Sequence, residues 1–291
     1  MYSPVTRAAT RIARTILPVS IRRPFGRFVY RTNLFWLSSI FKQSVEKKYA
    51  GIAADTGIPF MNLGYYDQEL QKQLHLKNDD EPWRYNIQLY HHLAAGIDLT
   101  NKNILEIGCG NGGGCYYLAN YHSPQNVVGM DLSSDNVEFC RKKHGNYALF
   151  IKGDAERISR HLTADVPGSY DVVFNIESSH HYPNIDRFFS EVAKVLVSNG
   201  IFCYAGFSTL DTLDKNEDLI KKVGFTIARK NNITTHVLES LNRDKKRKEE
   251  FLSTSREYSY MLSFFAHPDS WEYNAFKSGA KEYRSYICTK N

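Results

Sequence analysis

Cysteine is scarce in this sequence and never closely paired. The 291 residues contain five cysteines, with no Cys-x-x-Cys pair and no histidine-rich spacing. This argues against a zinc site, and an odd number of scattered cysteines favours reduced thiols in an intracellular protein. Apolar residues make up 42% of the chain and charged residues 23%, so neither collagen-like composition nor global disorder is indicated. We expect a folded protein without a bound metal.

The first 48 positions lack acidic residues almost completely. They contain ten lysines or arginines and one acid, Glu46, so this segment carries a net charge of +9. The whole chain has a net charge of +6, which leaves −3 for the other 243 residues. A mildly acidic body does not provide the diffuse basic field of a nucleic-acid-binding protein. We therefore expect no nucleic acid partner.

Residues 1–59 are expected to form a basic N-terminal arm. Residues 25–41 are apolar and aromatic, but they contain two arginines and are too short to cross a membrane. Three roles stay open for the arm. It resembles a mitochondrial transit peptide in composition, residues 1–45 suit peripheral contact with an anionic membrane, and its helices could pack on the following domain. The corresponding locations are mitochondrial, membrane-peripheral and cytoplasmic.

From residue 84 onward the hydrophobic pattern alternates between helical and strand periods. Buried strands separated by helices predict an α/β fold with a Rossmann-like, doubly wound, mostly parallel sheet. Residues 282–290 alternate and are expected to form an antiparallel last strand at or near the sheet edge. The other expected strands are residues 103–108, 126–132, 148–154, 170–178, 201–207 and 225–230. The expected helices are residues 84–95, a helix through 116–120, a helix capped by Ser133 or Ser134, residues 186–197, and residues 218–223.

The strongest functional signal is the glycine-rich loop that follows the first of these strands. It contains Gly108, Cys109, Gly110 and Gly112 and leads into a helix. Glycines let the backbone turn sharply and approach a ligand, and the helix start offers free N–H groups. Cys109 is expected to serve as a small packing residue in this loop.

Three acids end three consecutive predicted strands, and they indicate which kind of ligand the glycine-rich loop binds. Glu106 can hold the amino group of an amino-acid moiety, often through water. Asp131, nineteen residues past Gly112, stands where an acid bonds ribose hydroxyls. Asp154 can accept from an adenine amino group, and Ala155 offers a backbone N–H. A pyrophosphate gains nothing from Glu106, which argues against the alternative of an NAD-dependent dehydrogenase.

In order and spacing these motifs resemble class I S-adenosylmethionine (SAM)-dependent methyltransferases over about residues 60–205. The resemblance implies SAM as cofactor. The implied SAM site contains Glu106, Gly108, Cys109, Gly110, Gly112, Asp131, Leu132, Asp154 and Ala155, with Asn175 and Glu177 as orienting or SAM-contacting groups.

The segment NIESSHHYPNIDRFFSEVAKVL (175–196) is similar to small-molecule O-methyltransferases, especially the phthiotriolone/phenolphthiotriolone dimycocerosate methyltransferases. That resemblance implies a hydroxyl of a hydrophobic small molecule, such as a lipid or polyketide, as the methyl acceptor. A hydroxyl must lose its proton, and imidazole, with a pKa near ~6.5, can accept it at neutral pH. The resemblance places a histidine base here, which we assign to His180 or His181. Helix capping is the alternative role for both.

The regions on either side of the core are expected to cover the ligand. Within a methyltransferase domain spanning 60–291, residues 60–83 form the predicted lid, and about 231–276 form an aromatic substrate cap. Tyr65, Tyr66 and Trp83 either close over SAM or substrate or pack in the core.

A charged run at 242–250 is expected to be a solvated helix face. N- or C-methylation of another metabolite, an RNA or protein methyltransferase, and a SAM-binding subunit without turnover are the alternative functions. The sequence specifies neither the acceptor nor the oligomeric state.

Overall fold

The computed structural model describes residues 57–162, 169–253, 265–268 and 270–291. Most of the predicted arm (1–56) and part of the predicted cap (254–264) therefore lie outside the described residues. Within the described ranges, no helix is both long and apolar enough to span a membrane.

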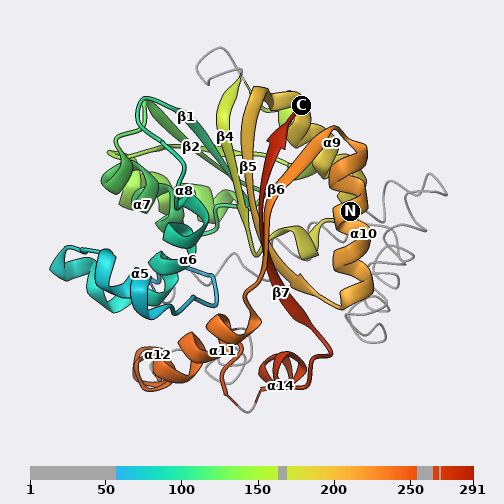
Figure 1. The fold of residues 1–291 in the computed structure, drawn as a ribbon. Coiled ribbons are helices and arrows are strands. Elements are labelled where there is room, and N and C mark those ends of the chain that lie inside the picture. Colours follow the sequence, from blue (N-terminus) through green and yellow to red (C-terminus); the bar gives the residue numbers. More distant parts are fainter. Residues whose placement is uncertain (1–56, 163–168, 254–264, 269) are drawn as a thin grey trace, which may run out of the picture.

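The centre of the molecule is a seven-stranded sheet in the order β3-β2-β1-β4-β5-β7-β6 (Figure 1). Neighbouring strands from β3 to β5 in this order are parallel, whereas β7 is antiparallel to both of its neighbours. The predicted doubly wound, mostly parallel sheet is confirmed, and the antiparallel last strand lies one position from the edge. The strands are β1 (Asn103–Ile107), β2 (Asn126–Asp131), β3 (Leu149–Lys152), β4 (Tyr170–Ile176), β5 (Leu196–Ser208), β6 (Phe225–Asn232) and β7 (Glu282–Lys290).

Helices cover both faces of the sheet because successive strand residues point to opposite sides. Ile104 packs in one core cluster with residues of α6 and α7, whereas Leu105 packs in a second cluster with residues of α9. The helices are α5 (Gln68–Gln73), α6 (Arg84–Ala94), α7 (Gly113–His122), α8 (Ser134–His144), α9 (Ile185–Val195), α10 (Leu210–Lys222), α11 (Thr234–Arg243), α12 (Lys245–Leu252) and α14 (Trp271–Lys277). The described residues also form the 3-10 turns η1 (Asn78–Trp83), η2 (Ala155–Arg160) and η3 (Ser179–His181).

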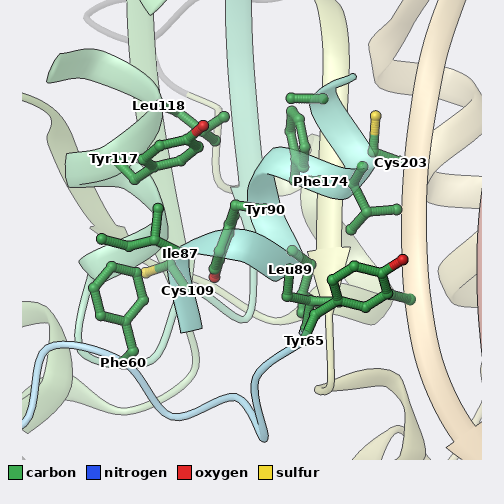
Figure 2. Packing of buried hydrophobic residues seen from close by; sticks show 14 of the residues in the cluster. Phe60, Tyr65, Ile87, Leu89, Tyr90, Cys109, Tyr117, Leu118, Phe174 and Cys203 are labelled. Carbon is green, nitrogen blue, oxygen red and sulfur yellow. The ribbon is translucent and has the colours of Figure 1, made fainter. Parts of the chain in front are cut away.

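Additional helices lie beyond the carboxyl ends of the parallel strands, where α5, α11, α12 and α14 gather (Figure 1). An extended segment without regular secondary structure, residues 57–66, leads into α5, and we call it the strap. Figure 2 shows two strap side chains, Phe60 and Tyr65, near Tyr90 of α6 in the same packed cluster. The strap is thus anchored in the core while it passes across this end of the sheet.

Several predicted boundaries differ from the structure. The helix expected at 218–223 already begins at Leu210, and the strands expected at 148–154 and 170–178 are shorter, ending at Lys152 and Ile176. The helix expected to reach residue 197 ends at Val195, and the strand expected after Gly200 already begins at Leu196. The β4–β5 register shifts between Tyr170 and Val172, and Asn199 has a φ of 60°. Residues 198–200 therefore form an irregularity inside β5.

The run 242–250 is only partly the solvated helix face that its charge pattern predicts. Asp244 is 3% exposed and Lys248 is 7% exposed. Both Arg247 and Lys248 form ion pairs with Asp244, three and four positions earlier. This local pairing compensates part of the charge, which lets part of the run pack against the strap.

Candidate functional site

The glycine-rich loop joins β1 to α7 at the carboxyl end of the sheet. Gly108 has a φ of 69°, a left-handed conformation that favours glycine. Its backbone N–H donates to the carbonyl of Met130 at 2.7 Å, which ties the loop to β2. A Cβ atom on Gly108 would collide with the Ser178 side chain. The loop therefore approaches the segment after β4 more closely than any other residue type allows.

Asp131 ends β2 beside this loop. Its Oδ2 accepts the N–H of Gly110 at 2.9 Å, and its Oδ1 accepts the N–H of Ser133 at 2.9 Å. Ser133 in turn caps α8, as predicted, by accepting the N–H of Asn136 at 3.3 Å. Asp131 and Leu132 are both half-buried. Asp131 thus stays partly exposed as a residue while its carboxylate fixes the two loops that flank it.

Asp154 and Ala155 stand just past β3, at the same edge of the sheet. The Asp154 carboxylate accepts the N–H of Glu156 at 2.9 Å and begins the turn η2. Asp154 is half-buried and Ala155 is 9% exposed. Because β1, β2 and β3 are parallel neighbours, their carboxyl ends bring the loop, Asp131 and Asp154 into one row, as the sequence predicts.

Glu106 lies beneath the loop and does not reach its exposed side. The side chain is 1% exposed; Oε1 accepts the Tyr90 hydroxyl at 2.6 Å and Oε2 accepts the Cys115 thiol at 3.0 Å. Burial raises its pKa to about 7. Period-two alternation explains the direction, since Glu106 points to the same face as Ile104, toward α6 and α7. In this structure Glu106 supports the loop from below.

The raised pKa of Glu106 predicts a pH-dependent stability. A carboxyl group whose folded-state pKa exceeds its unfolded value stabilises the fold below the unfolded pKa, and this contribution is lost as pH rises through the folded value. Between about pH 5 and about pH 7.5 we expect the free energy of unfolding of wild type to fall by about 2 kcal/mol relative to that of Glu106→Gln. Urea unfolding of both proteins across this range measures the difference. Parallel pH curves for the two proteins would contradict the burial effect.

Asn175, Ser178 and Tyr182 form a polar cluster directly over Gly108. The buried Asn175 donates from Nδ2 to the carbonyl of Ile107 at 2.8 Å and to Ser178 Oγ at 2.7 Å. The Ser178 and Tyr182 hydroxyls lie 2.8 Å apart. Asn175 Oδ1 is buried without a hydrogen-bond partner, so this cluster presents a free acceptor beside the loop. Ser178 and Tyr182 were not predicted as site residues, because a lone serine or tyrosine carries no spacing signal in the sequence.

His180 and His181 lie on η3, immediately after this cluster. Their ring centroids are 3.9 Å apart, and the His180 ring lies 4.9 Å from that of Phe207 at the end of β5. Both are half-buried. Phe207 also lies 5.7 Å from Tyr283 of β7 and 5.3 Å from Phe276 of α14. The structure thus places the two predicted histidines next to an aromatic cluster.

Glu177 occupies the first position after β4 and has a φ of 53°. Its Oε1 accepts two hydrogen bonds, from the Tyr283 hydroxyl at 2.7 Å and from the backbone N–H of Leu63 at 2.8 Å. Burial raises the pKa of this carboxyl group to about 7. Glu177 therefore joins the strap to β7, and the sequence did not reveal this contact.

The strap crosses the glycine-rich loop. The carbonyl of Pro59 accepts the N–H of Gly113 at 3.0 Å, and that of Ile58 accepts Asn111 Nδ2 at 2.6 Å. Met61 lies over Gly110, since a Cβ there would approach its sulfur to 2.9 Å. Ile58 and Pro59 precede the predicted lid (60–83), whereas Met61 belongs to it and lies over the loop.

The three predicted lid aromatics have different surroundings. Tyr65 is buried and stacked between His92 and His236, at centroid distances of 4.5 and 4.7 Å, so it contributes to core packing. The Arg243 guanidinium lies 3.9 Å from the ring of Tyr66. Trp83 lines a pocket with Phe60, Lys248 and Phe265, under the guanidinium of Arg247.

The five cysteines are buried and unpaired, Cys109 among them. Among the described residues there is no group of three or more His, Cys, Asp or Glu side chains able to hold a metal ion.

Comparison with known proteins decides the family. A profile described as a methyltransferase domain matches residues 105–204. The "Probable phthiotriol/phenolphthiotriol dimycocerosates methyltransferase 2" of Mycobacterium ulcerans is 34% identical over 196 residues, which cover 66% of this chain and 72% of that protein. The chain belongs to the SAM-dependent methyltransferases. Within this family, the fatty-acid O-methyltransferase of Mycolicibacterium smegmatis is 43% identical over 154 residues, covering 52% of this chain and 53% of the relative.

The match to several curated methyltransferases is partial, since the chain spans about half of their length. Among solved methyltransferase folds, the cyclopropane synthase MmaA2 of Mycobacterium tuberculosis aligns with a TM-score of 0.57 and 16% identity, covering 80% of this chain and 94% of that one. That likeness shows the fold alone. The family membership identifies SAM as the cofactor.

Proposed function

We propose that this protein transfers a methyl group from SAM to a hydroxyl of a hydrophobic small molecule, such as a lipid or polyketide. The observation that carries the proposal is the row of loop, Asp131 and Asp154 along the carboxyl ends of β1, β2 and β3, next to histidines and aromatic rings. The names of the relatives, which include a fatty-acid O-methyltransferase and phthiotriol methyltransferases, support a lipid-like acceptor.

The residues present fit SAM. Asp131, which stays partly exposed, can accept from ribose hydroxyls beside a loop whose glycines permit close approach. The Asp154 carboxylate can accept a hydrogen bond from the adenine amino group, and the backbone N–H of Ala155 can donate one to the adenine ring. The buried, unpartnered Asn175 Oδ1 can accept a hydrogen bond from the ammonium group of SAM. When bound, SAM supplies an electrophilic methyl group on a sulfonium. The protein must then hold the acceptor oxygen within ~3–3.5 Å of the methyl carbon, in line with the bond from sulfur to that carbon.

Acceptor binding and proton removal are assigned to the segment after β4. The partly exposed ring of Phe207, which is backed by the buried rings of Phe276 and Tyr283, supplies apolar surface for a hydrophobic acceptor beside His180. The proposal includes deprotonation of the hydroxyl assisted by His180 or His181, which stand at the end of the strand adjacent to the glycine loop.

The histidine role predicts a loss of rate without a loss of cofactor affinity. General-base assistance contributes about a hundredfold or more, so alanine at the base position should lower kcat about a hundredfold. The wild-type rate should rise with pH through the ordinary imidazole range, near ~6.5, and this rise should vanish in the affected variant. Steady-state kinetics of His180→Ala and His181→Ala, with S-adenosylhomocysteine binding in parallel, test this. Full activity of both single variants would remove the mechanism.

The function itself is tested with isotope-labelled SAM in a host-cell extract. We expect label in the organic fraction, and its loss with Asp131→Ala but not with Asp211→Ala, a matched carboxylate exposed on α10. Label confined to the aqueous fraction would move the acceptor to sugars or other polar metabolites. Label on RNA or protein would overturn the small-molecule assignment.

A further inference from the structure

Glu177 has an arrangement that neither cofactor binding nor histidine-assisted proton removal requires. Both of its hydrogen bonds, from Tyr283 and from Leu63, fall on the same oxygen, Oε1. Its second oxygen, Oε2, accepts no hydrogen bond from any described residue. Two donors therefore orient the carboxylate and leave one acceptor oxygen unused.

The position of Glu177 is also unusual. Its φ of 53° is a left-handed conformation that is strained for a residue with a side chain. The residue lies two positions after Asn175 of the polar cluster and three before His180. Its partner Tyr283 packs 5.7 Å from Phe207, whose ring lies 4.9 Å from that of His180. The carboxylate thus lies between the cofactor loop and the aromatic cluster.

Resting on the proposed function, we propose that Glu177 selects a neutral hydroxyl over a carboxylate as the methyl acceptor. A hydroxyl can donate its hydrogen to Oε2, whereas a carboxylate has no hydrogen to donate and is repelled by the like charge. The distinction matters because the relatives bear names for both kinds of acceptor, a fatty acid and phthiotriol.

The transfer itself forms a C–O bond and breaks the S–CH₃ bond, and the hydroxyl proton passes to a base in the site. Glu177 determines which kind of acceptor binds and is not required to take the proton. The same discrimination is therefore expected whether the proton ends on an imidazole or on this carboxylate.

Cations near Glu177 do not convert the site into a carboxylate receptor. Lys248 lies close enough to lower the pKa of Glu177, but it is already paired with Asp244 at 3.6 Å. Lys281 is paired with Glu272 at 2.6 Å, and Glu272 raises the pKa of Glu177. Lys248 shares Asp244 with Arg247, and Lys281 pairs with Glu272, so each nearby ammonium group already contacts a carboxylate.

The test compares dodecan-1-ol with dodecanoic acid as methyl acceptors for wild type and Glu177→Gln. Glutamine has the same shape and backbone cost but no charge. We expect wild type to prefer the alcohol, and the acid-to-alcohol ratio of kcat/KM to rise about tenfold or more in the variant. Glu138→Gln, an exposed carboxylate on α8, serves as the control and should leave the ratio unchanged.

The pH dependence provides a readout that a purely structural role would not move. Groups that face Glu177 are Tyr283 from β7, Lys248 from α12 and Glu272 from α14, with His180 on the following turn. Because the carboxyl group titrates near pH 7, wild type should tolerate the acid at about pH 6 and reject it about tenfold more strongly at about pH 8. Glu177→Gln keeps both histidines, so the difference between wild type and this variant isolates the contribution of Glu177. In Glu177→Gln the tenfold change in the ratio between about pH 6 and about pH 8 should be absent.

Equilibrium binding of dodecan-1-ol and dodecanoic acid to the complex with S-adenosylhomocysteine tests the selection role of Glu177 even without turnover. Equal affinity of wild type for acid and alcohol at about pH 8, or an unchanged ratio in Glu177→Gln, would overturn the selection role. If selection in binding follows Glu177 while the extract yields no labelled organic product, the proposed function fails and the role of Glu177 stands.

Discussion

Replacing Asp131 by alanine is expected to weaken SAM binding about a thousandfold. A carboxylate that accepts two ribose hydroxyls forms charge-assisted hydrogen bonds worth about 1.5–3 kcal/mol each. The same side chain holds the N–H groups of Gly110 and Ser133, so its loss also releases the loop from the end of β2. Preorganisation and direct contact are thus lost together.

Calorimetric titration with SAM measures this effect, and a thermal melt shows whether the variant is folded. Asp131→Asn, which keeps one carbonyl oxygen, should have intermediate affinity, whereas Asp211→Ala should match wild type. SAM affinity within about threefold of wild type in a folded Asp131→Ala protein would contradict the placement of the ribose.

Substituting alanine for Gly108 is expected to destabilise the protein by about 3 kcal/mol and to abolish SAM binding. Alanine at a φ of 69° costs about 1–2 kcal/mol, and its Cβ would collide with Ser178. Either the loop or the segment after β4 must then move. Both belong to the proposed cofactor site, so stability and affinity should fall together.

Gly224 offers a matched control for this substitution. It has a φ of 96°, but a Cβ there would meet nothing within 4 Å. Gly224→Ala should therefore show only the backbone cost, about 1 kcal/mol, and keep SAM affinity. Adding Ser178→Gly to Gly108→Ala should recover part of the lost stability, because it removes the atoms in collision. Equal losses in the two alanine variants would show that crowding at Gly108 is unimportant.

Local sequence patterns were sufficient for the row that is proposed to bind the cofactor. Asp131 and Asp154 each follow an apolar run, and parallel strands bring their carboxyl ends to one edge whatever surrounds them. The glycine loop is likewise a property of consecutive residues. Strand alternation also puts Glu106 on the face of Ile104, inside the core, as the structure shows.

The strap and the acceptor side of the site depend on contacts between distant parts of the chain. Glu177 meets Tyr283, which is 106 positions away, and Leu63, which is 114 positions away. A lone glutamate or tyrosine has no periodicity that links it to a partner so far off. The burial of Lys248 in a charged run has the same origin, because the strap that covers it comes from the other end of the domain.

The sequence by itself determined the sheet, the glycine loop and the strand-end acids, because hydrophobic period and strand direction are local and repetitive. Only the tertiary structure decided that Glu106 lies beneath the loop and that Ser178 requires glycine at 108. It likewise placed Glu177 between the strap and β7 with one oxygen unused. These features arise from close packing of segments that are far apart in the chain, where the shape and charge of each side chain matter and no short-range pattern records them.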